Sequence, residues 1–157
     1  MKQQFLTPPM WLAAACFLLS LFVHLASIAG VVVLGNLGFF ALHVGIFVVW
    51  MPAFLATREA KLPSDQTSSW NGSRARVWKE IFTTAPAWMR YGVQLVAAYA
   101  LCNFLFFVIH ALKHPNPADS LTPSVVRGFS GHWLIFYSAG FTVLYGALRR
   151  RALDDGK

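Results

Sequence analysis

Residues 9–56 read PMWLAAACFLLSLFVHLASIAGVVVLGNLGFFALHVGIFVVWMPAFLA and contain no Asp, Glu, Lys or Arg. This apolar run is too long for one core helix of a soluble protein, and about 20 apolar residues cross the hydrocarbon core of a bilayer once. The run therefore predicts two membrane-spanning helices. The turn between them must lie between Gly30 and Gly38, because the only turn-forming residues available are Gly30, Gly35, Asn36 and Gly38.

Two more apolar stretches follow, so the sequence predicts an all-α fold with four spans, at about residues 10–32, 37–56, 91–112 and 128–148. Pro8 and Pro9 should keep the first span from starting earlier, and Arg149 should end the last one. We expect one membrane domain covering residues 1–157, a polytopic antiparallel bundle of four transmembrane helices. The composition agrees, because 57% of the residues are hydrophobic and only 12% are charged, against about 25% charged in soluble domains.

The basic residues predict the orientation of this bundle. With four spans, both termini and the loop 57–90 lie on one side, and the loop 113–127 lies on the other. The first side carries Lys2, Arg58, Lys61, Arg74, Arg76, Lys79, Arg90, Arg149, Arg150, Arg151 and Lys157, which leaves only Lys113 and Arg127 for the second side. By the positive-inside rule, the N and C termini and the loop 57–90 are cytoplasmic, the loop 113–127 is external, and the protein lies in the inner (plasma) membrane. The net charge of +7 thus flanks apolar spans, so no nucleic-acid partner is expected.

The cytoplasmic loop contains a candidate interfacial helix at Arg74–Thr84. Its apolar residues fall on one face, Val77, Trp78, Ile81 and Phe82, while charged residues occupy the remainder. Such a segment is typical of a helix in the headgroup plane. The alternative is a polar loop followed by an early start of the third span.

Small and polar residues at helical spacing mark the faces that should meet inside the bundle, since close backbone approach stabilises helix packing in lipid. The candidate faces are Cys16, Ser20, His24 and Ser27 in the first span, Gly38, Ala41 and Gly45 in the second, and Ser138, Thr142 and Gly146 in the fourth.

Histidines are the only candidates for chemistry, since the spans contain no Asp, Glu, Lys or Arg. His24 and His43 lie at similar distances from the first turn, and His110 and His132 flank the external loop. Four imidazoles would then converge in the outer half of the bundle. Paired imidazoles can ligate the iron of haem b, or bind copper or zinc. Each histidine can equally serve as a structural group, with its ring bonded to a serine or a carbonyl of a neighbouring helix.

We therefore expect a multi-pass membrane protein that is not an enzyme and acts as an accessory, assembly or interaction subunit. Its expected partners are the lipid bilayer and other membrane subunits or further copies of itself. The first alternative is a small b-type membrane cytochrome using His24 with His43, or His110 with His132. The second is a transporter for a small neutral solute along Ser20, Ser27, Gln94, Asn103, Ser138 and Thr142.

Overall fold

The computed structural model describes residues 5–59, 70–113 and 121–155, and these residues are nearly all helical, with no strand among them. The helices are α1 (Thr7–Ile28), α2 (Asn36–Glu59), α3 (Trp70–Thr84), α4 (Ala87–Lys113) and α5 (Pro123–Asp155). The all-α prediction is confirmed. Residues 114–120 of the predicted external loop lie outside the described residues, and the part of the loop from Pro123 onward is helical.

Helix α1 begins earlier than expected, at Thr7, with Pro8 and Pro9 in its first turn. The expectation that these prolines stop the helix was wrong. The first N–H groups of a helix have no intrahelical partner, and the fixed φ of proline suits the first turn, so prolines are tolerated there.

The end of α1 is set by Gly30, which has a φ of +81°. The N–H of Gly30 donates to the carbonyl of Ser27 (3.1 Å), and the N–H of Val31 donates to that of Ala26 (2.9 Å). This pair of bonds is the Schellman motif, in which a left-handed glycine closes a helix. The break between α1 and α2 therefore falls inside the predicted interval, and the first span is shorter than the predicted 10–32.

Helix α5 extends beyond the predicted span at both ends, from Pro123 to Asp155. The sequence predicts that the span ends at Arg149, and the structure shows that the helix itself continues past that residue. Arginine is a good helix former, so a change from apolar to basic residues marks a change of surroundings and leaves the helix intact. In the same way α3 begins before Arg74 and α4 begins before Tyr91.

Within the described residues, three helices are long and apolar enough to cross a membrane: α1, residues Asn36–Thr57 of α2, and α4. Helix α5 is not among them, although the sequence predicts a span within it. The chain has the features of a membrane protein through these three helices.

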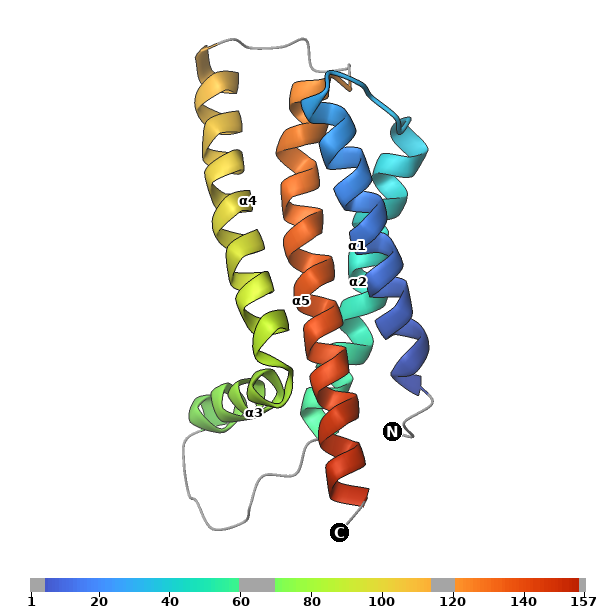
Figure 1. The fold of residues 1–157 in the computed structure, drawn as a ribbon, viewed down its shortest axis with the longest axis vertical. Helices are drawn as coiled ribbons and strands as arrows, with labels where there is room; N and C mark the ends of the chain where they lie inside the picture. Colours follow the sequence, from blue (N-terminus) through green and yellow to red (C-terminus); the bar gives the residue numbers. More distant parts are fainter. Residues whose placement is uncertain (1–4, 60–69, 114–120, 156–157) are drawn as a thin grey trace.

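Helix α5 is the centre of the packing and contacts each of the other helices. In Figure 1, α4 lies on one side of α5, and α1 and α2 lie on the other. Helix α1 begins, and α5 ends, at the end of the molecule where α3 lies crosswise (Figure 1). The least apolar of the long helices is thus the one that the others cover.

Small residues on α5 allow this central position. A Cβ atom on Gly128 would meet the ring of Phe107 from α4, and one on Gly140 would lie 2.7 Å from a methyl carbon of Val49 on α2. A Cβ atom on Gly146 would lie 2.3 Å from the carbonyl oxygen of Ile81 on α3. These three glycines of α5 therefore each lie against a different helix, as expected where backbones approach closely.

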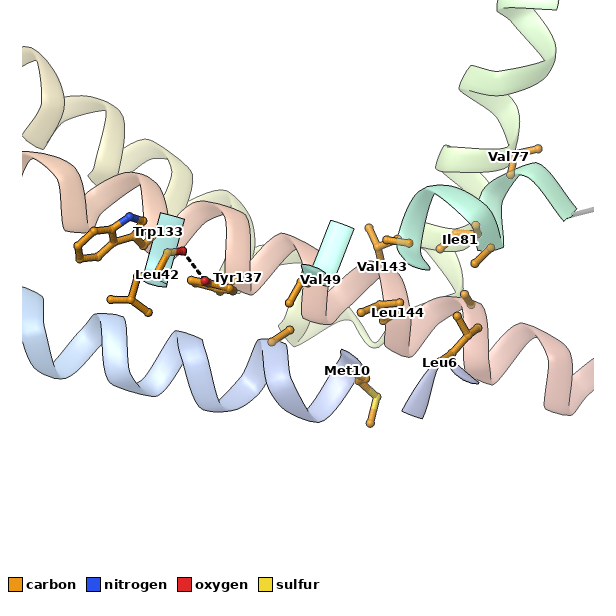
Figure 2. Packing of buried hydrophobic residues seen from close by; sticks show 14 of the residues in the cluster. Leu6, Met10, Leu42, Val49, Val77, Ile81, Trp133, Tyr137, Val143 and Leu144 are labelled. Carbon is orange, nitrogen blue, oxygen red and sulfur yellow. Dashed lines mark hydrogen bonds between the residues drawn. The ribbon is translucent and has the colours of Figure 1, made fainter. Parts of the chain in front are cut away.

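The buried side chains of α1, α2, α3 and α5 form one apolar cluster (Figure 2). The hydroxyl of Tyr137 donates to the carbonyl of Leu42 (2.5 Å), the dashed bond in Figure 2, and so joins α5 to α2. Helix α2 enters the cluster through Leu42, Val49, Ala53 and Ala56. On the predicted inner face of α2, Gly45 lies against Tyr137, whereas Ala41 is exposed. Larger residues on an adjacent face of α2 make the contact with α5 instead.

Helix α3 contains the helix that the sequence predicts at Arg74–Thr84, and its apolar face packs against the rest of the molecule. Val77 and Ile81 are 5% and 1% exposed, and the ring of Trp78 contacts Trp50 and Phe54 of α2 at centroid distances of 6.1 and 5.7 Å. The exposed side of α3 carries Lys79 and other polar groups.

Candidate functional site

His24 lies where α1, α4 and α5 meet, and its side chain is buried (2% exposed). Its Nδ1 atom lies 2.7 Å from Oγ of Ser130 on α5, and its Nε2 atom lies 2.6 Å from the hydroxyl of Tyr99 on α4. The Ser130 hydroxyl donates to the carbonyl of Arg127 (3.2 Å). The serine oxygen therefore accepts from Nδ1–H of His24, and the Tyr99 hydroxyl donates to Nε2.

This network uses both ring nitrogens of His24 in its neutral form. A nitrogen that accepts a hydrogen bond has no free lone pair for a metal, and one that carries a proton has none at all. His24 thus acts as a polar connector between three helices. Two other members of its predicted face, Ser20 and Ser27, are buried too, and the Ser27 hydroxyl donates to the carbonyl of His24 (2.7 Å).

His43 of α2 lies beside His132 of α5, with ring centroids 4.9 Å apart and ring planes at 52°. Nδ1–H of His43 donates to the carbonyl of Phe39 (2.9 Å), since a carbonyl can only accept. The Nε2 atom of His43 therefore carries the lone pair. Aromatic rings enclose the two imidazoles: Phe39, Phe129, Trp133 and Phe136.

The structure thus pairs the histidines differently from the sequence prediction. His24 contacts Tyr99 and Ser130, His43 contacts His132, and His110 is exposed in the last turn of α4. The predicted pairing followed distance from the turns along the chain. It did not include rotation about each helix axis, which decides the face on which each ring lies.

The contact between His43 and His132 is closer than a haem requires. Two imidazoles on opposite faces of a haem iron have ring centroids about 6 Å apart, because each metal–nitrogen bond is about 2 Å long and the porphyrin lies between the rings. At 4.9 Å the two rings touch directly. Among the residues that the structure describes, no group of three or more His, Cys, Asp or Glu side chains could hold a metal ion.

Two buried polar atoms in the same region have no hydrogen-bond partner within the described parts of the chain. They are Oγ of Ser20 and Nε1 of Trp133, and both side chains are fully buried. Unpaired buried groups are uncommon, and a bound water molecule often satisfies them. Nε1 of Trp133 adds a hydrogen-bond donor, and Oγ of Ser20 adds a hydroxyl, to the polar groups between α1, α2 and α5.

Sequence reasoning missed Tyr99, Ser130 and Tyr137, whose hydroxyls join helices in this structure. The sequence feature that could have identified such residues is a hydroxyl in the same half of the bundle as a buried histidine. Ser130 lies only two positions before His132, at the external end of the predicted fourth span, and His24 was expected deeper in the same outer half of the bundle.

Comparison with protein-family models, curated proteins and solved structures finds no match to this chain.

Proposed function

We propose that this protein crosses the inner membrane four times, as an antiparallel bundle with both termini cytoplasmic, and acts as a non-catalytic accessory or assembly subunit of another membrane protein. The fourth span is α5, which the other helices surround. The described polar groups at span depth bond mainly to one another or to carbonyls, which favours a structural role. The observation that carries the proposal is the outer surface of α4.

Helix α4 packs along α5 and leaves its outer face uncovered within the described part of the chain. Toward the C-terminal end of that face, Phe106 and Ile109 are 77% and 53% exposed. Cys102, Phe106 and Ile109 follow one another at spacings of four and three residues, a pattern that places side chains along one seam for a partner helix. A neighbouring transmembrane helix fits this face.

A double variant, Phe106→Ala with Ile109→Ala, tests the docking face, with Phe47→Ala on α2 (72% exposed) as the control. Purification in mild detergent should yield the native chain with a stoichiometric membrane-protein partner. We expect the double variant to lose that partner and Phe47→Ala to retain it. Isolation of the native chain free of partners, stable and with an activity of its own, would contradict the proposal.

A small b-type electron carrier is the alternative, and the contact between His43 and His132 is the observation that supports it. Haem insertion would require these rings to separate. A visible spectrum of protein expressed with adequate haem decides the question. A Soret band that disappears in His43→Ala and His132→Ala but persists in His110→Ala would replace the accessory role with electron transfer.

The transporter hypothesis has less support. Of its predicted polar path, Ser27, Ser138 and Thr142 each donate to a carbonyl of their own helix, and Asn103 donates to the carbonyl of Arg127. Hydroxyls and amides engaged in this way are poor groups for lining a water-filled route.

A further inference from the structure

The helices α3, α4 and α5 contact one another at the end of the molecule where α3 lies crosswise (Figure 1). We call this end the α3 corner and define it by three basic residues: Lys79 of α3, Arg90 of α4 and Arg149 of α5. Lys79 and Arg149 are exposed, and Arg90 is half-buried. The described acidic side chains nearby bind a different residue, because Glu80 and Asp154 lie 2.8 and 4.0 Å from the guanidinium of Arg150. The positive charge of the α3 corner is therefore not neutralised by the carboxylates that the structure describes.

Specific contacts hold the three helices of this corner together. The close approach of Ile81 to Gly146 seats α3 on α5. Arg149 donates to the carbonyl of Thr84 (3.3 Å) at the C-terminal end of α3, where helix carbonyls lack intrahelical partners and a cation is favourable. Helix α4 begins at Ala87, three residues after Thr84, so Arg90 lies within one turn of this junction.

Arg90 has an unsatisfied donor. Its Nε atom is buried and has no hydrogen-bond partner among the described residues. A buried guanidinium N–H calls for an acceptor, and a phosphate oxygen is a strong one, because guanidinium and phosphate form charge-assisted, often bidentate hydrogen bonds.

Apolar side chains continue from the α3 corner along α4. Trp88, Tyr91 and Leu95 are 70%, 65% and 71% exposed. Trp and Tyr are enriched at the level of lipid headgroups, and an exposed Leu one turn deeper suits acyl chains. A ligand matching both parts has an anionic head and hydrocarbon tails.

We propose that the α3 corner binds an anionic phospholipid, with the phosphate between Lys79, Arg90 and Arg149 and the acyl chains along the first turns of α4. This inference rests on the membrane placement proposed above but requires no protein partner. A lipid bound there would stabilise the packing of α3 on α4 and α5 from the cytoplasmic leaflet.

The test uses the purified full chain in detergent, delipidated and then supplied with phosphatidylglycerol or phosphatidylcholine in mixed micelles. Native mass spectrometry counts bound lipid, and thermal unfolding reports stabilisation. We expect one retained phosphatidylglycerol per chain and a higher Tm with that lipid than with phosphatidylcholine. Equal retention of the two lipids would overturn the proposal.

The variant that tests the site is Lys79→Gln with Arg90→Gln, and its control is Lys113→Gln with Arg127→Gln. Both double variants remove two positive charges, but the control removes them from exposed positions at the opposite end. We expect the first to bind phosphatidylglycerol roughly tenfold or more weakly, since each basic residue contributes to attraction of anionic lipid. Equal affinity in the two variants would refute the assignment.

Further measurements distinguish binding of a lipid from binding of a soluble anion, and loss of lipid binding from loss of folding. Inorganic phosphate at the same concentration should not raise the Tm, and an increase matching that of phosphatidylglycerol would make this a soluble-anion site instead. Arg90→Lys alone, with Lys79 native, keeps the positive charge but removes the guanidinium, so we expect it to bind phosphatidylglycerol more tightly than Arg90→Gln and more weakly than the native chain. A lipid-free Tm near the native value for all variants confirms that each is folded, and Arg90→Lys binding no more tightly than Arg90→Gln would contradict the role of the charge.

Discussion

At the scale of single residues, His24 shows how a polar side chain can be satisfied deep among apolar helices. Its two nitrogens bond to Tyr99 and Ser130, so three helices share one neutral hydrogen-bond network. A buried group of this kind costs free energy if a partner is removed, because its desolvation is no longer offset. We therefore expect the fold to be sensitive to substitutions in this network, although most contacts between the helices are apolar.

Tyr99→Phe tests this network. The variant removes the hydroxyl that donates to Nε2 of His24, and we expect it to lower the free energy of unfolding by about 1–2 kcal/mol. Tyr91→Phe is the matched control, because Tyr91 lies on the same helix and is 65% exposed. Unfolding in mixed detergent, followed by tryptophan fluorescence, compares them. Equal stability of the two variants would mean that the hydrogen bond contributes nothing.

At the scale of elements, the contact between α3 and α5 depends on Gly146. A methyl group there would lie 2.3 Å from the Ile81 carbonyl oxygen, and backbone cannot move aside as a flexible side chain can. The apolar face of α3 alone would permit several positions on the bundle, whereas this close approach selects one.

Gly146→Ala should therefore displace α3 and lower the stability by about 1–3 kcal/mol, the usual range for overpacking. The control is Gly92→Ala, because a Cβ on Gly92 meets nothing within 4 Å and alanine is the better helix former by up to about 1 kcal/mol. Thermal unfolding in detergent would show a lower Tm for Gly146→Ala only. A Tm equal to that of Gly92→Ala would show that α3 is not held by this contact.

At the scale of the whole molecule, α3 lies at the end where α1 begins and α5 ends (Figure 1). With four spans, that end should be cytoplasmic, because it carries most of the basic residues. The arrangement makes a definite prediction about which positions reach the same side of the membrane.

Single cysteines at Thr83, Asp154 and Ser124, in a chain whose native Cys16 and Cys102 are replaced by alanine, test this orientation. An impermeant maleimide should label position 124 in intact cells, and positions 83 and 154 only after permeabilisation. Labelling of 83 and 154 from opposite sides would exclude the four-span arrangement.

The sequence by itself determined the helices and their apolar character, because helix formation and membrane burial depend on local composition. The run from Pro9 to Ala56 has no charged residue that would favour water over lipid, and Gly30 allows the turn that divides the run. The sequence was a weaker guide to which face of each helix lies toward the interior. Ser20, His24 and Ser27 were found by spacing, whereas Ala41 was placed inward and lies exposed. Only the tertiary structure decided that α5 is central, that His43 meets His132 and that Tyr99 reaches His24. Those contacts depend on the rotation and crossing of whole helices, and these are set by many small packing contacts between segments far apart in the chain.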